Sequence, residues 1–137
     1  MSETVKAKAN VLFYDKEKPD MGRGAAGQLV LTDRRLMYVR YLWKSMRALV
    51  KDYADTLDEG LANKGSIEIP LGQILEARAE RRWGTPYLKI RYQISTREES
   101  CAFVFTTSLW MIAGGVDVRK STAERLASTI EQLKKRI

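Results

Sequence analysis

Residues 27–39 read GQLVLTDRRLMYV, and this stretch decides the fold of the chain. Two apolar segments flank a polar turn, which predicts a strand over residues 28–32, a turn over 32–35 and a second strand over 35–42. Asp33 suits the turn because its carboxylate can accept hydrogen bonds from nearby backbone amides. Both alternating sets of side chains in the second strand are apolar, so we expect both of its faces to be covered.

Alternating apolar side chains predict five further strands around this hairpin. A strand that has one face in a core shows apolar side chains at every second position. These strands are expected over residues 9–14, 67–71, 73–83, 87–94 and 101–105, and their inward side chains are expected to include Leu75, Ala77 and Ala79, then Leu88, Ile90, Tyr92 and Ile94, then Cys101, Phe103 and Phe105.

Between about residues 43 and 62 apolar side chains recur every three or four residues, which predicts an amphipathic helix inserted between the third and fourth strands. Three interpretations of its apolar face stay open: it covers the sheet of its own chain, it forms a dimer or partner surface, or it lies on a membrane. A second helix is expected over about residues 118–136. As a partner surface, the first helix would present Trp43, Met46, Val50, Tyr53 and Leu57.

The composition is that of one globular domain over residues 1–137, with 45% hydrophobic and 30% charged residues. The chain has one cysteine and no histidine, which excludes sites built from Ser-His or Cys-His pairs or from histidine and a metal. Apolar runs fall far short of the roughly 20 residues that cross a bilayer, and the N-terminal residues do not resemble a signal peptide. We therefore expect a cytoplasmic protein without a transmembrane segment, metal site or cofactor.

The 24 basic and 17 acidic side chains give a net charge of +7, spread evenly along the chain. This excess favours anionic partners, but it serves equally well to keep a protein in solution. Lys16, Lys18 and Arg23 lie in the loop before the first quoted strand, where residues 22–27 match the pattern G-x-G-x-x-G. The pattern favours a flexible hairpin loop over a dinucleotide site, because the dinucleotide motif must open a helix and here the pattern leads into a strand. The three cations could still hold a phosphate beside exposed backbone amides.

A second group of basic and aromatic side chains lies around residue 80. Cations next to aromatic rings can bind a membrane interface, an acidic peptide or single-stranded nucleic acid. Glu76 and Glu80 alternate with the arginines, so the group also fits a solvated face whose charges pair across strands. Its members are Arg78, Arg81, Arg82, Trp83 and Tyr87.

Seven short strands followed by one helix fit a small antiparallel bent barrel or sandwich with the helix plugging an open end. Four segments in this order resemble the GRAM and bacterial pleckstrin-homology-like families: GQLVLTDRRL (27–36), IPLGQI (69–74), LKI (88–90) and FVF (103–105). The resemblance implies a mainly β, PH-like fold of seven antiparallel strands capped by a C-terminal α-helix. The helix expected at about 43–62 departs from the family pattern.

The resemblance also implies a binding module, most often for acidic phospholipid head groups or for protein partners. Acidic neighbours interleave with the basic residues of the corresponding loop and would weaken a doubly charged ligand. For Arg35 we expect a structural role, holding the turn or a nearby carboxylate. The implied lipid site comprises Lys16, Lys18 and Arg23, joined by Arg34 and Arg35 or by Arg40.

Three classes of function stay open from the sequence. The preferred hypothesis is peripheral binding to anionic phospholipid membranes, and the alternative is a protein interaction or dimerisation module that uses the inserted helix or a sheet edge. Nucleic-acid binding ranks third. We expect no enzyme and no catalytic residues, because carboxylates such as Glu68, Glu76 and Asp117 are scattered without forming a pair.

Overall fold

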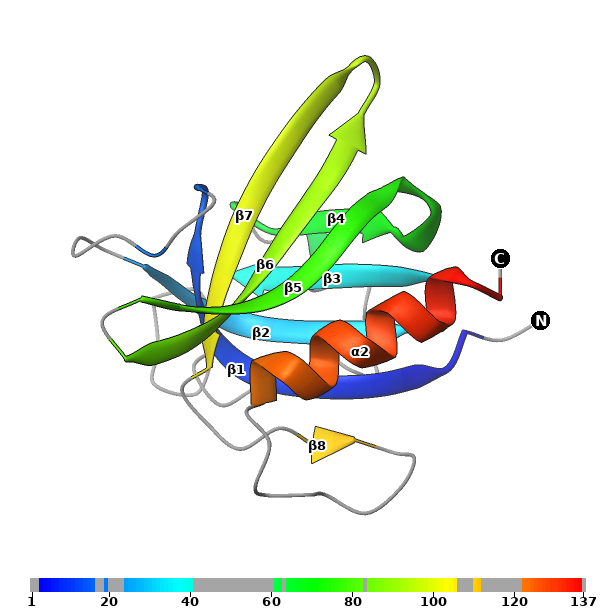
Figure 1. Ribbon diagram of the computed structural model, residues 1–137. Helices are drawn as coiled ribbons and strands as arrows, with labels where there is room; N and C mark the ends of the chain where they lie inside the picture. The colour runs from blue at the N-terminus through cyan, green and yellow to red at the C-terminus, as the bar shows by residue number, and fades with distance from the viewer. Residues whose placement is uncertain are drawn as a thin grey trace.

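The expected strands form one antiparallel sheet in a computed structural model of the chain (Figure 1). The structure describes residues 3–16, 19, 24–40, 61–62, 64–82, 84–105, 110–111 and 122–136. Its elements are β1 (Val5–Tyr14), β2 (Ala25–Thr32), β3 (Arg35–Arg40), β4 (Ile67–Pro70), the 3₁₀ turn η1 (Leu71–Gln73), β5 (Ile74–Arg82), β6 (Thr85–Ile94), β7 (Arg97–Phe105), the short strand β8 (Trp110–Met111) and the helix α2 (Thr122–Lys134).

The strands lie in the order β4-β3-β2-β1-β7-β6-β5, and β8 pairs with β1 beside this series. The sheet bends, so that β5, β6 and β7 cross over β1, β2 and β3, while α2 lies along the body next to β5 (Figure 1). The described residues are therefore mainly β, with seven antiparallel strands in series, the short β8 beside them and helix α2 at the C-terminal end, which confirms the expected PH-like architecture. The helix is described from Thr122 onward, and the expected residues 118–121 lie outside the described part.

The core is built from the inward faces of both halves of the sheet and from α2. The side chains of Leu88, Cys101 and Phe103 are 0% exposed, as the alternation predicts. Burial raises the pKa of the Cys101 thiol, so this side chain packs as a small apolar group. Gly27 lies under the ring of Tyr38, where a Cβ atom would come within 2.4 Å of a ring carbon. The quoted stretch therefore needs a glycine at its first position.

Both faces of β3 are covered, as the sequence predicts. Leu36 and Tyr38 face the main core, while Met37 and Val39 on the opposite face are 0% exposed. The helix proposed as the cover for that face, over residues 43–62, lies outside the described residues except at its last two positions.

The inward row expected in β5 is wrong at its first member. Ile74 pairs with Tyr92 and Glu76 pairs with Arg91, so Leu75 is an extra residue in a β-bulge and its side chain is 40% exposed. A bulge shifts the alternation by one position, which turns Ile74 rather than Leu75 toward the core. Ile94 is also wrong as a core residue: it is 44% exposed at the end of β6.

Helix α2 covers part of the free edge of β5, the last strand of the sheet. Glu131 accepts a hydrogen bond from the backbone N–H of Ala77 at 3.0 Å, and Lys134 donates one to the carbonyl of Leu75 at 3.1 Å. An uncovered strand edge is a template for pairing with other chains. Glu131 and Lys134 thus provide hydrogen-bond partners for the backbone of this edge next to the β-bulge.

The turn between β2 and β3 is held by Thr32 and Arg35. The Thr32 hydroxyl accepts hydrogen bonds from the backbone N–H groups of Arg34 and Arg35, while Asp33, expected in that role, accepts one from the N–H of Thr4. Arg35 binds Glu3 through two nitrogens, at 2.9 and 3.0 Å, and reaches Glu68 of β4 at 2.9 Å. Arg35 thus has the structural role expected for it.

Replacing Arg35 by alanine should destabilise the fold, because the Arg35 and Glu3 side chains are each only 17% exposed and Glu3 would lose a charged hydrogen-bond partner. We expect a loss of about 2 kcal/mol in the free energy of unfolding, measured with urea at pH 7. Arg34→Ala removes a neighbouring exposed cation and should cost less than about 0.5 kcal/mol.

The ion pair between Arg35 and Glu3 makes the stability of the fold depend on pH. Burial raises the pKa of Glu3, but hydrogen bonds from Arg35 and Thr32 and the charge of Arg35 outweigh it, so this pKa lies below its ordinary value of 4.5. The stabilisation is present above about pH 4.5 and is lost as the pH falls through the lowered folded value. Arg35→Ala should flatten the pH dependence in that window. Equal stability losses for Arg34→Ala and Arg35→Ala would contradict this account.

The bulge can be tested with a matched pair of substitutions. Leu88→Ala should cost about 2–5 kcal/mol of unfolding free energy because it leaves a cavity in the core, whereas Leu75→Ala should cost less than about 1 kcal/mol. Urea unfolding of both variants is the measurement. Similar losses would mean that Leu75 faces the core after all.

Candidate functional site

Several strand ends meet at one end of the barrel, beside the connection between β1 and β2. Pairing of Phe13 with Ala25 and of Gly27 with Arg40 brings the end of β1, the start of β2 and the end of β3 together. The hairpin of β6 and β7, in which Tyr92 pairs with Glu99, borders the same region. The register of the sheet thus collects side chains from five strands, β1, β2, β3, β6 and β7.

A pocket of about 640 Å³ opens between these strand ends. Its volume lies in the range of sites for small ligands or head groups. One part of its lining is apolar and aromatic, and the other part carries both positively and negatively charged side chains. Its lining residues are Phe13, Tyr14, Asp15, Lys16, Ala25, Arg40, Gly65, Ile67, Tyr92, Ile94 and Glu99.

Arg40 is placed at this pocket by the segment that leads into β4. The backbone N–H of Arg40 donates a hydrogen bond to the Ser66 hydroxyl at 2.9 Å. Gly65 has a φ of +92°, and a Cβ atom there would come within 2.6 Å of Arg40 Cδ. A residue with a side chain would therefore be strained at position 65 and would displace the Arg40 side chain.

The wall of the pocket nearest the core is aromatic. The ring of Phe13 stacks on Tyr38 at 4.7 Å between centroids and lies 5.5 Å from Phe103. The Tyr38 hydroxyl donates a hydrogen bond to the carbonyl of Ala25 at 2.6 Å, which fixes this ring stack against the start of β2. The wall is thus rigid and apolar.

Tyr92 lies where the aromatic and the charged parts of the pocket meet. It is 7% exposed, and burial together with the nearby Cys101, Asp15 and Glu99 raises its pKa to about 12. The phenol is therefore neutral at physiological pH. The contributions of Asp15 and Glu99 indicate that both carboxylates lie within electrostatic reach of its hydroxyl.

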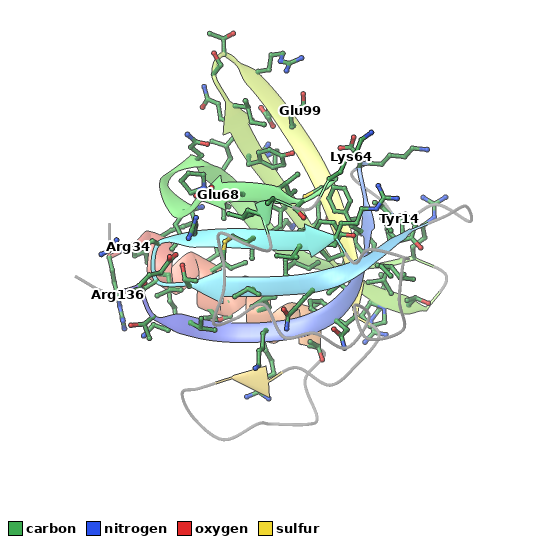
Figure 2. All side chains as sticks on the ribbon, turned by 180° about the vertical axis from the view of Figure 1, so that it is seen from behind. Tyr14, Arg34, Lys64, Glu68, Glu99 and Arg136 are labelled. Carbon is green, nitrogen blue, oxygen red and sulfur yellow. The ribbon has the colours of Figure 1, made fainter. Side chains whose placement is uncertain are left out.

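The basic residues expected to form one lipid site divide between the two ends of the barrel. Lys16 and Arg40 line the same pocket, whereas Arg34 and Arg35 lie at the far end of the β2–β3 hairpin, roughly 17 Å from Arg40 along β3. Figure 2 shows this separation, with Arg34 and Arg136 on one side and Tyr14, Lys64 and Glu99 on the other. Lys18 and Arg23 lie outside the described residues.

Of the second basic and aromatic surface, the structure describes one aromatic member, Tyr87, and that residue is buried. Tyr87 is 1% exposed and donates its hydroxyl proton to Glu80 at 2.8 Å, so the expectation that it is a surface residue is wrong. Arg78 lies 3.9 Å from Glu80, and Arg81 contacts the carbonyl of Gly84. Tyr87 is buried although it lies on the face of β6 opposite the inward row, where Lys89 and Arg91 are only half-buried. Trp83 lies outside the described part.

The proposed partner surface, Trp43, Met46, Val50, Tyr53 and Leu57, also lies outside the residues that the structure describes. Within the described ranges, no group of three or more cysteine, aspartate or glutamate side chains could hold a metal ion. No helix in those ranges is long and apolar enough to cross a membrane.

Sequence reasoning missed Tyr92, Ile94 and Glu99 as site residues. Tyr92 and Ile94 were counted as core because they continue an inward apolar row, and Glu99 was not singled out. The sequence does contain a signal for Tyr92 and Ile94 as site residues. The apolar row of residues 88–94 runs into the hairpin turn at residues 95–100, so its last side chains must lie where the core ends and the barrel opens. Locating that opening beside Asp15 and Lys16 requires the strand pairing.

Comparison with known proteins supports the fold. The structure resembles the Vps36 N-terminal PH domain with a TM-score of 0.56 and 14% sequence identity, over 98% of this chain and 81% of that chain. No protein-family model and no curated protein sequence matches the chain. At this identity the likeness shows a PH-like fold.

Proposed function

We propose that the protein binds anionic phospholipid head groups and associates peripherally with a membrane, at its cytoplasmic face, through the pocket at the end of β1. The observation that carries this proposal is that Lys16, just beyond the end of β1, and Arg40, at the end of β3, line one pocket of about 640 Å³. Two cations that converge on one concavity can contact a single phosphate from two sides. The net charge of +7 adds long-range attraction to an anionic surface.

Two further features support a membrane ligand. Ile94, 44% exposed, lies on the lining of the same pocket, so an apolar side chain is available to contact acyl chains beside the head group. The GRAM-like motifs of the sequence point to the same class of ligand by analogy. Together these features make the pocket end the side that would face the bilayer.

The proposal predicts that a Lys16→Ala/Arg40→Ala variant binds anionic vesicles more weakly. Each cation near the surface contributes about 1 kcal/mol, so the double variant should lose roughly 25-fold in affinity for phosphatidylglycerol vesicles in a sedimentation assay. Binding by the unchanged protein should fall with added salt.

The matched control is Arg34→Ala/Arg136→Ala, which removes the same charge from the opposite end of the molecule. This control should lose much less affinity if the pocket contacts the lipid. Equal losses for both double variants would indicate attraction by net charge alone. Absence of vesicle binding by the unchanged protein would reject the proposal.

A second candidate function, self-association through the free edge of β5, rests on the charge pattern of that strand. The N–H of Ala77 faces the edge, and alternate residues share this direction, so Ala79 presents its backbone there as well. A second copy paired antiparallel about Ala79 would place Arg78 opposite Glu80 and Glu76 opposite Arg82. Such a self-complementary contact suits a two-fold dimer.

Light scattering at increasing concentration tests this candidate, and the mass should rise toward that of a dimer. Arg78→Glu should weaken dimerisation about tenfold because it places two carboxylates opposite each other at each end of the contact. Arg97→Glu, an equal charge change on the distant hairpin, should leave the mass unchanged. A monomer at every concentration would exclude the candidate.

A further inference from the structure

The pocket has an acidic side that the proposed phosphate contacts do not use. Asp15 and Glu99 both line it, and among the described residues neither takes part in an ion pair or a side-chain hydrogen bond. Two such carboxylates would repel a ligand that carries several phosphate groups. They favour a ligand with a positive group next to its phosphate.

Tyr92 adds an unused polar group to this part of the pocket. The residue is 7% exposed and lines the pocket, and its hydroxyl has no hydrogen-bond partner within the part of the chain that the structure describes. This hydroxyl is not among the fully buried unpartnered atoms, so it opens onto the pocket, where a ligand can reach it. A neutral phenol oxygen can accept a hydrogen bond from an ammonium group.

The aromatic rings of the pocket suit the same positive group. Phe13, Tyr14 and Tyr92 line the pocket together with the two carboxylates. A cation beside an aromatic face and a carboxylate is stabilised by both, and more strongly when it is shielded from water. The carboxylates, the free phenol and the rings therefore select one chemistry, an organic ammonium.

We propose that the head group bound in this pocket is a phosphodiester that carries a primary ammonium group, as phosphatidylserine does. Its phosphate lies between Lys16 and Arg40, and its ammonium group lies among Asp15, Glu99 and the Tyr92 hydroxyl. This inference rests on the proposed lipid-binding function and adds the class of head group. It explains why the pocket combines both signs of charge, which a purely anionic ligand would not require.

The test compares vesicles of phosphatidylcholine that contain equal fractions of phosphatidylserine or of phosphatidylglycerol, two lipids with the same net charge. The unchanged protein should bind the phosphatidylserine vesicles about five- to tenfold more tightly. Glu99→Gln and Asp15→Asn should each bring this ratio close to one, and Tyr92→Phe should lower it about threefold. Lys16→Ala/Arg40→Ala should weaken binding to both kinds of vesicle.

Glu98→Gln is the matched control, because Glu98 is a neighbouring carboxylate that pairs with Arg91 and does not line the pocket. It should keep the preference for phosphatidylserine, and thermal unfolding should show that all variants are folded. Soluble glycerophosphoserine should compete with the vesicles more strongly than glycerophosphoglycerol if the head group itself is recognised.

The outcomes separate the inference from the proposed function. Equal binding of both lipids by the unchanged protein would overturn the ammonium assignment and leave the anionic-lipid proposal standing. A preference for phosphatidylserine that Glu99→Gln, Asp15→Asn and Tyr92→Phe all retain would also overturn the assignment. Failure to bind either kind of vesicle would reject the proposed function as well.

Discussion

The sheet does not close on itself, and the rest of the structure depends on this constraint. Only the turn η1 separates β4 from β5 along the chain. In the sheet, however, these two strands lie at opposite ends of the strand order. The side of the barrel between them must be covered by another element, because a gap would expose the core and the edge of β5. Helix α2 provides this cover with an apolar face that includes Leu126 and Ile130 and with the polar contacts of Glu131 and Lys134. The helix is therefore a part of the barrel wall.

The two ends of the barrel differ in how their charges are used. At the β2–β3 turn, Arg35 is shared between Glu3 and Glu68, so the charges are neutralised within the protein. At the pocket, Asp15 and Glu99 lie beside a buried phenol without such partners among the described residues. Paired charges stabilise the fold, whereas an exposed carboxylate such as Asp15 stays in contact with solvent and open to a ligand. The charges at the β2–β3 turn thus stabilise the fold, and those at the pocket lie at the end where we propose that the ligand binds.

The sequence predicted the strands well because alternation is a local property. The order of elements, the two covered faces of β3, the buried Cys101 and the structural role of Arg35 all follow from patterns within about ten residues. It failed where a non-local feature intervened: the bulge at Leu75 depends on pairing with β6, and the buried Tyr87 binds Glu80 of the neighbouring strand β5. The grouping of Lys16 with Arg40 rather than with Arg34 likewise depends on strand register, which spacing along the chain does not contain.

The position of Cys101 makes it a natural reporter of motion in this barrel. It is the only cysteine of the chain and is 0% exposed, opposite Ile90 in the β6–β7 hairpin. A thiol reagent can reach it only when this hairpin separates from the core, so the rate of labelling measures how often the hairpin opens. Because Tyr92 and Glu99 lie on the same hairpin, that rate measures how often the pocket end of the barrel opens, and no substitution is needed to introduce the reactive group.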